Sequence, residues 1–197
     1  MAIIVDKVQK RKDIALSCKQ LVLDKGIKNI TISEMAKTAG VGKGTLYDYF
    51  KSKEDVVFEI VNILLVKHNE TKEKDIAALH STKEKVKIFF KFFYDEQEYE
   101  LREIYKEFIA IALTSPEHSM TEFHLQCSIR YHTWFETIIQ TGIDAHEIIP
   151  DSKKLVKGLY VLAEGLFISG STTGKLENLE VEINNHIDAI FELIKVK

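Results

Sequence analysis

Helical periodicity along almost the whole chain is the feature that most constrains its fold. Apolar residues recur every three or four positions over the 197 residues, and only two prolines, Pro116 and Pro150, interrupt them. No alternating pattern typical of a β-strand extends beyond a few residues, and the sequence contains no internal repeat and no low-complexity linker. The pattern therefore predicts an all-α fold, with a small N-terminal helical unit ahead of a larger helical body.

Capping signals mark where several helices should begin and end. Gly26 is placed to end a helix whose apolar positions run over residues 14–22, and Thr31 with Glu34 has the capping-box spacing that opens a short helix. Further helix starts are expected at Ser52, at Ser81, at Ser115 followed by Pro116, and at Asp151 or Ser152. Gly142 is expected to end the segment that opens at Ser115, and a last helix should begin near Leu179.

Charge is divided unevenly along the chain, although the formal net charge is only −3. Residues 1–53 contain 11 Lys and Arg against 5 Asp and Glu, giving +6, whereas residues 54–197 contain 16 against 25, giving −9. This division predicts an anionic partner for the N-terminal segment alone. A solvated basic face is the alternative.

Composition excludes several classes of protein. A hydrophobic content of 45% is too high for a disordered chain, and no apolar run approaches the roughly 20 residues of a membrane span. The two cysteines give no disulfide framework, and the first residues lack a signal-peptide pattern. We therefore expect a cytoplasmic protein that does not interact with a membrane.

Residues 31–50 carry the most informative pattern of the sequence. Two short helices joined by a turn at Gly40 are predicted, with Leu46 and Phe50 anchoring the second helix from beneath. The side chains expected to point outward from it are Lys43, Thr45, Tyr47, Asp48 and Tyr49. Such a pair of helices is typical of a helix-turn-helix, whose second helix enters the major groove of DNA. An αα-hairpin that only packs is the alternative.

The same segment resembles the N-terminal signature of the tetracycline-repressor (TetR) family. The similar residues are Gly26-Ile27, Thr31-Ile32, Met35-Ala36, Gly40-Val41, Gly44-Thr45-Leu46-Tyr47, Tyr49-Phe50, Lys53 and Val56. The resemblance implies a homodimer that binds a pseudo-palindromic operator on double-stranded DNA, usually as a repressor that a small-molecule effector releases. It also implies a DNA-binding domain over residues 1–53 and an effector-binding and dimerisation domain over residues 54–197.

Carried over by position, the resemblance implies seven DNA contacts. Lys43, Gly44 and Thr45 would meet DNA at the start of the second helix, Tyr47 and Tyr49 would contact the backbone and base edges, and Thr31 and Lys53 would hold phosphates. The chemistry agrees, because lysines and helix N-termini bind phosphate and tyrosine rings suit thymine methyl groups. The sequence departs from the family at Gly42, where a serine-like cap is common. Asp48 adds an acid that we expect to turn away from the phosphates, with acceptance from a cytosine amine as the alternative.

No pattern in the sequence supports a catalytic site, a metal site or a cofactor. The run Gly42-Lys43-Gly44-Thr45 lacks the upstream glycine and the strand of a phosphate-binding loop. The seven histidines include no pair at i, i+4, so no ready metal site exists on a helix. A helical enzyme, or a helical protein-binding module without DNA activity, is the alternative function.

Twelve of the 19 aromatic residues lie between positions 89 and 135. Phe89, Phe90, Phe92 and Phe93 span nearly the whole circumference of a helix, so they are not expected to face one core together. The surplus predicts a mostly apolar ligand pocket, with an aromatic core as the alternative. Its expected lining residues are Phe89, Phe93, Tyr105, Phe108, His124, Cys127, Tyr131 and Trp134. Because aromatic faces attract cations and glutamates are frequent over residues 89–136, we expect an apolar, aromatic or cationic effector.

Helices near residues 152–169 and 179–196 carry more apolar surface than a single core contact requires. The first is apolar on more than one side, and Gly158 and Gly165 would permit the close approach of another helix. The second adds Ala189 and Leu193 beside its main apolar stripe. This surplus predicts a subunit interface, and the resemblance implies a four-helix bundle formed with the same two helices of a second copy.

Overall fold

The computed structural model describes residues 6–114, 118–174 and 178–196. Within these ranges every regular element is a helix, and the one β-type pairing is an isolated bridge between Ile148 and Lys195. The predicted all-α fold is confirmed. No helix in the described ranges has the length and apolarity to cross a membrane. The chain forms two compact units, Met1–His68 with Glu100–Phe123 and Asn69–Tyr99 with His124–Lys197.

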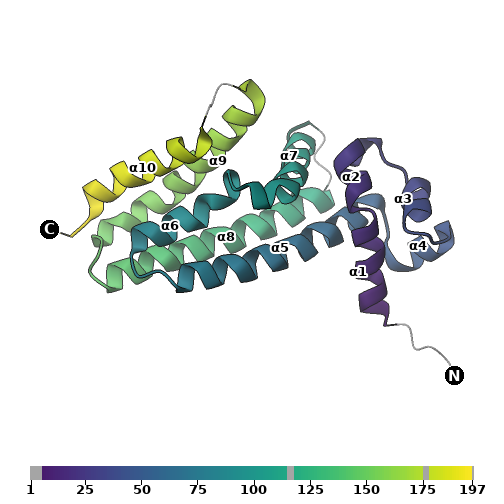
Figure 1. Ribbon diagram of the computed structural model, residues 1–197, viewed down its shortest axis with the longest axis horizontal. Coiled ribbons are helices and arrows are strands. Elements are labelled where there is room, and N and C mark those ends of the chain that lie inside the picture. Colours follow the sequence, from purple (N-terminus) through teal and green to yellow (C-terminus); the bar gives the residue numbers. More distant parts are fainter. Residues whose placement is uncertain (1–5, 115–117, 175–177, 197) are drawn as a thin grey trace. The chain divides into compact units, whose positions relative to one another are not determined.

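The first unit contains the short N-terminal helices and parts of three longer ones (Figure 1). Its elements are α1 (Lys7–Ser17), α2 (Lys19–Lys25), the 3-10 helix η1 (Ile27–Asn29), α3 (Ile32–Thr38), α4 (Lys43–Tyr49), the first part of α5 (Lys53–Ala77), nearly all of α7 (Tyr99–Thr114) and the start of α8 (His118–Asp144). Their buried apolar side chains form a core of their own, and the half-buried ring of Phe58 stacks on the half-buried ring of Phe123 at 4.9 Å and lies 5.8 Å from the buried ring of Phe108.

The helix predicted over residues 14–22 is in fact divided at Cys18. The Cys18 amide donates to the Ala15 carbonyl at 3.0 Å, an i−3 bond that tightens the turn, and the Ser17 hydroxyl donates to the Ile14 carbonyl at 2.7 Å. The apolar spacing survives the break, because Ile14, Cys18 and Val22 are all buried. Gly26 ends α2 with a φ of +73°, as its position in the sequence predicts.

The second unit contains the end of α5, most of α8 and the helices at the C-terminal end of the described chain. Its further elements are α6 (Thr82–Phe90), the 3-10 helices η2 (Lys91–Phe93), η3 (Glu96–Glu98) and η4 (Pro150–Leu155), α9 (Val156–Thr173) and α10 (Leu179–Ile194). α10 packs against both α6 and α9, and the three helices lie side by side in Figure 1. The predicted stripe of α10 faces this core, with Ile183, Ile187, Phe191 and Ile194 buried.

The predicted helix ends in this unit are confirmed at one position and wrong at two. A helix begins after Ser81 as predicted, but the Ser81 side chain makes no cap bond, and the Thr82 amide donates instead to a carboxylate oxygen of Glu147 at 2.8 Å. Gly142 does not end α8, which continues to Asp144. α9 begins at Val156, after the 3-10 helix η4, rather than near residue 152. The start predicted at Ser115 and Pro116 lies outside the described residues.

The four phenylalanines at positions 89–93 also differ from the expectation. α6 ends at Phe90 and the chain continues as the 3-10 helix η2, which changes the direction of the later side chains. Phe89, Phe90 and Phe93 are all buried and Phe92 is half-buried. The inference that these rings could not share one core is therefore wrong for Phe89, Phe90 and Phe93, because residues one turn apart share a face of a helix and neighbouring residues lie only about 100° apart around it.

Candidate nucleic-acid interface

α4 is a short helix with a buried base and an exposed outer face. Leu46 and Phe50 are fully buried, as their spacing predicts, and the turn before the helix passes through Gly40 with a φ of +65°. The residues turned outward are Lys43, Gly44, Thr45, Tyr47 and Asp48, with Tyr49 half-buried. Tyr47 exposes 51% of its surface, which a purely structural hairpin would not require.

The first turn of α4 has no side-chain cap and includes a glycine. Gly42 is its N-cap and provides no side-chain bond to the first turn, so the departure from a serine-like cap has a structural consequence. Gly44 lies inside the helix, where glycine costs about 1 kcal/mol relative to alanine. A Cβ atom at Gly44 would meet nothing within 4 Å, so packing in this chain does not explain the glycine. Close approach of another molecule's surface would explain it.

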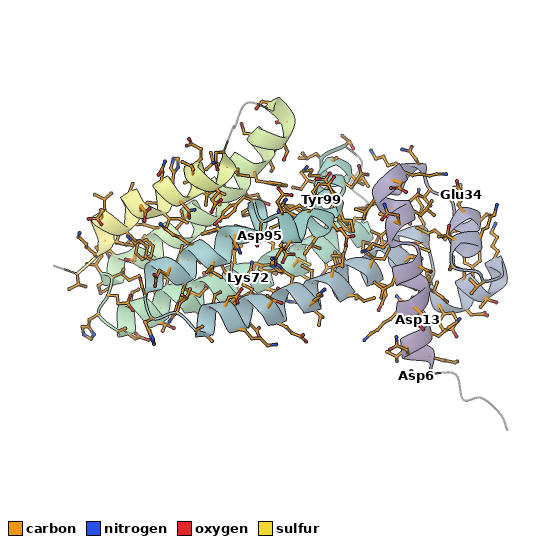
Figure 2. All side chains as sticks on the ribbon, in the orientation of Figure 1. Asp6, Asp13, Glu34, Lys72, Asp95 and Tyr99 are labelled. Atoms are coloured by element: carbon orange, nitrogen blue, oxygen red, sulfur yellow. The ribbon has the colours of Figure 1, made fainter. Side chains whose placement is uncertain are left out.

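α3 carries the capping box that its sequence predicts. The Thr31 hydroxyl accepts from the Glu34 amide at 3.2 Å, and a Glu34 carboxylate oxygen accepts from the Thr31 amide at 2.9 Å. Hydrogen bonds from Lys25 and Thr31 lower the pKa of Glu34, labelled in Figure 2, to about 2. The Thr31 hydroxyl also donates to that carboxylate at 2.8 Å, so its hydrogen must leave Glu34 before it can reach a phosphate.

Lys53 begins α5 and is tied to the backbone before α3. Its Nζ donates to the carbonyl oxygens of Lys28 at 3.1 Å and of Ile30 at 3.2 Å. An ammonium has three donors, so these two bonds leave one N–H for a phosphate oxygen. The contacts also hold the start of α5 against the segment that leads into α3.

Arg11 of α1 fixes the end of α4, and sequence reasoning missed this residue. Its Nε lies 2.8 Å from a Glu59 carboxylate oxygen and its Nη2 lies 3.1 Å from Asp55, both on α5. Its Nη1 donates to the carbonyl oxygen of Tyr49, the last residue of α4, and its Cζ lies 4.2 Å from the centroid of the Phe50 ring. Arg11 stands in a basic run with no local pattern to single it out, so no sequence signal could have identified it.

The start of α5 is joined to the same set of hydrogen bonds as Arg11. The Ser52 hydroxyl accepts from the Asp55 amide at 3.3 Å, so the predicted cap is present. The other Asp55 carboxylate oxygen accepts from the Lys51 amide at 3.0 Å. Asp55 therefore connects the turn after α4 to Arg11 of α1, and three helices share one set of charged hydrogen bonds.

α7 contacts the N-terminal helices through three polar pairs within the first unit. Lys19 of α2 lies 2.6 Å from a carboxylate oxygen of Glu100, and the Lys28 ammonium donates to the Thr114 hydroxyl at 3.0 Å. A Glu107 carboxylate oxygen accepts from the Ile27 amide at 3.2 Å. This carboxylate lies where a Cβ of Gly26 would stand, at 2.9 Å, so the turn after α2 needs glycine for two reasons.

The eight residues predicted to line a ligand pocket divide between the two units. Tyr105 and Phe108 belong to the first unit, where Phe108 is buried and its ring lies 5.7 Å from that of Phe123. The other six belong to the second unit and are Phe89, Phe93, His124, Cys127, Tyr131 and Trp134. Among the described residues no group of histidine, cysteine, aspartate or glutamate could hold a metal ion.

Within the second unit, Phe89 lies at the centre of the aromatic side chains. Its ring lies 5.1 Å from Phe135, 5.6 Å from Trp134 and 6.3 Å from Tyr131. The Tyr131 hydroxyl donates to the side-chain oxygen of Asn69 at 2.7 Å. Burial raises the pKa of Tyr131 and of the Cys127 thiol, so both groups are neutral near pH 7.

The N-terminal part of the sequence matches a known family. Residues 19–60 match the bacterial regulatory proteins of the tetR family. This part of the chain is therefore similar to that family. The match includes α3, α4 and the start of α5, and so contains all seven residues predicted to contact DNA. The resemblance seen in the sequence is thereby confirmed for residues 19–60.

Relatives with known names are similar over the same part of the chain. The fatty acid metabolism regulator protein of Bacillus subtilis is 34% identical over 67 residues, which is 34% of this chain and 34% of that protein. An HTH-type transcriptional regulator of Staphylococcus aureus is 36% identical over 56 residues, or 28% of this chain and 30% of that protein. The similarity thus spans about a third of the length of these relatives, both of which are named as regulators.

The fold is shared over nearly the whole length. A transcriptional regulator from Saccharomonospora viridis, solved in complex with choline, has a TM-score of 0.78 at 15% identity. The comparison covers 96% of this chain and 100% of that one. The helical body that follows residues 19–60 therefore shares the fold of that solved structure, although the sequences have diverged.

Proposed function

We propose that this protein is a DNA-binding transcriptional regulator, a repressor that binds a palindromic operator as a homodimer and is released by a small-molecule effector. α4 supports the proposal most directly, because it turns polar and aromatic side chains outward from a buried base in the part of the chain with a charge of +6. Residues 1–53 would bind DNA, residues 54–197 would bind the effector and dimerise, and the protein would act in the cytoplasm.

The proposed DNA contacts follow from the exposed face of α4. Lys43, Gly44 and Thr45 would meet the DNA at the start of the helix, and Tyr47 and Tyr49 would contact the backbone and base edges. Lys53 would bind a phosphate through its remaining N–H, whereas Thr31 would first have to release Glu34. The bonds of Arg11 to Tyr49 and Asp55 would keep α4 in one orientation while it binds.

The outward faces of α9 and α10 support dimerisation through residues 152–169 and 179–196. Val161 is 53% exposed on α9 and Leu193 is 81% exposed on α10, although each helix has its own buried stripe. A Cβ atom at Gly158 or at Gly165 would meet nothing within 4 Å, so neither glycine serves close packing inside one chain. A second copy could approach closely along this face.

The proposed effector is a small apolar, aromatic or cationic molecule. The aromatic side chains around Phe89 supply an apolar surface with faces that attract cations. A structurally similar regulator binds choline, a cation, and a relative is named for fatty acid metabolism. The six predicted lining residues of the second unit are the ones we propose for its binding.

Binding to labelled duplex DNA, measured by fluorescence anisotropy at several salt concentrations, tests the proposal. Lys53→Ala should weaken binding to every duplex and reduce the slope of log affinity against log salt by about one unit, because one phosphate contact is lost. Tyr49→Ala should also change the preferred sequence. Lys74→Ala, which alters an exposed lysine of α5, should leave binding unchanged. Absence of salt-dependent binding by the wild-type protein would contradict the proposed function.

A further inference from the structure

Asp48 is an acidic residue on the side of α4 that lies opposite its buried side. Successive residues of an α-helix are about 100° apart around its axis, so Gly44 and Asp48 each lie about 160° from the buried Leu46. No other residue of α4 lies so nearly opposite Leu46, and both residues are exposed. Because Gly44 has no side chain, the carboxylate of Asp48 is the chemical group at the centre of the outer face of this helix.

The fold does not account for a carboxylate at this position. Asp48 forms no hydrogen bond and no ion pair with another residue of the described ranges. Arg11, which binds the end of α4, pairs instead with Asp55 and Glu59. Asp48 also lies in the last turn of α4, where the helix dipole disfavours an acid and where no basic residue is present. An acid at this position therefore does not stabilise the helix.

The same carboxylate is unfavourable for binding to DNA in general. The segment around it is otherwise suited to phosphates, since residues 1–53 carry a charge of +6 and Lys43 is exposed on the same helix. A negative charge on the outer face of α4 repels the phosphates of any duplex, whatever its sequence. The repulsion is offset only where a base supplies a hydrogen-bond donor to the carboxylate. Asp48 is therefore suited to discriminate between sequences rather than to increase affinity.

The base edges in the major groove favour cytosine as the partner of a carboxylate. An ionised carboxylate has acceptors and no donor. Guanine presents two acceptors in this groove, thymine presents an acceptor and a methyl group, and adenine presents an acceptor beside its amino group. Cytosine presents its N4 amino group, which is a donor. A carboxylate therefore binds cytosine, whereas the acceptors of the other three bases repel it.

Gly44 supplies the close approach that a short aspartate side chain needs in order to reach a base. It lies one turn before Asp48 on the same line of the helix. A Cβ atom at Gly44 would meet nothing within 4 Å, so the space beside Asp48 is open. Without a side chain at position 44, the helix backbone can come closer to the base edges than an alanine would permit.

We propose that Asp48 determines part of the sequence preference of this protein by accepting a hydrogen bond from the N4 amino group of a cytosine in each half-site, and that Gly44 permits the approach. The inference rests on the proposed function and takes the place of the expectation that Asp48 turns away from the DNA. Because the two copies of α4 in a dimer are related by two-fold symmetry, cytosine should be preferred at two symmetry-related positions.

Selection of duplexes from a random-sequence pool by the full-length protein, followed by sequencing, tests the contact. The wild type should select a C·G pair at two symmetry-related positions. Asp48→Asn should select an A·T pair there, because an amide accepts from N6 of adenine and donates to N7. Glu73→Gln removes an exposed acid of α5 outside residues 19–60 and should select the wild-type sequence. The same preferred sequence for the wild type and Asp48→Asn would overturn the proposal.

Fluorescence anisotropy with the selected duplex measures the size of the effect. Replacement of the C·G pair in one half-site should weaken wild-type binding by about tenfold or more, and binding of Asp48→Ala by less than about twofold. Asp48→Ala should also bind a duplex of unrelated sequence about twofold more tightly than the wild type, because a repulsive charge is removed. Equal losses in the two proteins on replacement of the C·G pair would overturn the proposal.

Gly44→Ala tests the link between the two positions. The added methyl group should hold Asp48 away from the base, so the loss on replacement of the C·G pair should fall below about threefold, and further change of Asp48 to Ala should add nothing. An undiminished loss would overturn the role of Gly44. Salt-dependent binding by the wild type, together with an unchanged preference in Asp48→Asn, would reject this inference and leave the proposed function standing. Absence of salt-dependent binding by the wild type would reject both.

Discussion

The guanidinium of Arg11 binds three acceptors at once, the Tyr49 carbonyl, Asp55 and Glu59, while its plane lies over the Phe50 ring. Only arginine has a fork of five donors in fixed directions that can meet such a set. The side chain is about one-third exposed, so solvent screens its ion pairs in part. Because Tyr49 is the last residue of α4, Arg11 fixes the orientation of that helix as well as stabilising the fold.

Replacement of Arg11 should distinguish the guanidinium fork from its charge. Arg11→Lys keeps the charge but cannot meet all three acceptors, so we expect the free energy of unfolding to fall by about 1–2 kcal/mol and DNA binding to weaken. Urea denaturation and anisotropy measure the two effects. Lys12→Met, at an exposed position of the same helix, is the control and should change stability little. An Arg11→Lys protein as stable as the wild type would show that the fork is dispensable.

Lys72 should give the protein a pH-dependent stability of known sign. Its pKa is about 7 in the folded state and near 10.5 in the unfolded state, so between these values the unfolded chain binds more protons. This group should therefore make the free energy of unfolding rise with pH from about 7 towards 10.5. Below pH 7 Lys72 is charged in both states, and the full cost of burying its ammonium lowers the stability of the fold. Urea denaturation of wild type and Lys72→Met over this range isolates the contribution. If the difference between the two proteins did not vary with pH, the folded pKa of Lys72 would be normal.

Helices α6 and α8 meet where Gly142 of α8 lies against Thr82 of α6. Thr82 leaves no room for a side chain at position 142, although it is distant in the sequence. A Cβ atom at Gly142 of α8 would stand 2.4 Å from the Thr82 hydroxyl oxygen and 2.6 Å from its methyl group. In the same turn of α8, the Gly142 carbonyl accepts a hydrogen bond from the Glu147 amide. A carboxylate oxygen of Glu147 in turn accepts from the Thr82 amide and so caps α6. The start of α6 thus depends on the end of α8 rather than on its own Ser81.

Two glycine-to-alanine substitutions should have opposite effects on stability. Gly142→Ala inserts a methyl group into Thr82 and should lower the free energy of unfolding by about 1–3 kcal/mol. Gly44→Ala, in a helix with open space around it, should raise stability by up to about 1 kcal/mol while it weakens DNA binding. Thermal and urea denaturation without DNA measure both variants. A destabilising Gly44→Ala, or a neutral Gly142→Ala, would contradict the packing described at these sites.

The whole protein is proposed to act as a dimer, because a single α4 would hold one half-site only. Two such helices related by two-fold symmetry would read half-sites about one helical turn of DNA apart, or a multiple of it. Val161 on α9 and Leu193 on α10 are apolar side chains that are exposed in the single chain. A substitution at these exposed positions should therefore affect dimer assembly without affecting the folding of the single chain.

Leu193→Glu tests the assembly without damage to the fold. Leu193 is 81% exposed in the single chain, so the charge should leave its folding intact but should separate the subunits, because an unpaired carboxylate in an interface is costly. Sedimentation should show monomers, and operator binding should be lost. Leu113→Glu on α7, at a side chain 77% exposed and outside the proposed interface, should remain dimeric. A dimeric Leu193→Glu protein would place the interface elsewhere.

The sequence by itself determined the helical class, the two short helices with their turn, and most of the helix starts. These features depend on neighbours within four residues: the bonds between Thr31 and Glu34, the positive φ of Gly40, and the spacing of Leu46 and Phe50. The tetR-family pattern is of the same local kind, so it too could be recognised from the sequence.

Only the tertiary structure decided the features that join distant segments. Arg11 reaches residues more than 35 positions away, Glu147 caps a helix 65 positions earlier, and Lys72 meets rings from two other helices. The end of α6 at Phe90, with the 3-10 helix η2 directly after it, interrupts a regular helical pattern. No periodicity encodes such contacts, because they depend on which surfaces meet once the helices have formed, and the burial of a charge is decided by those surfaces.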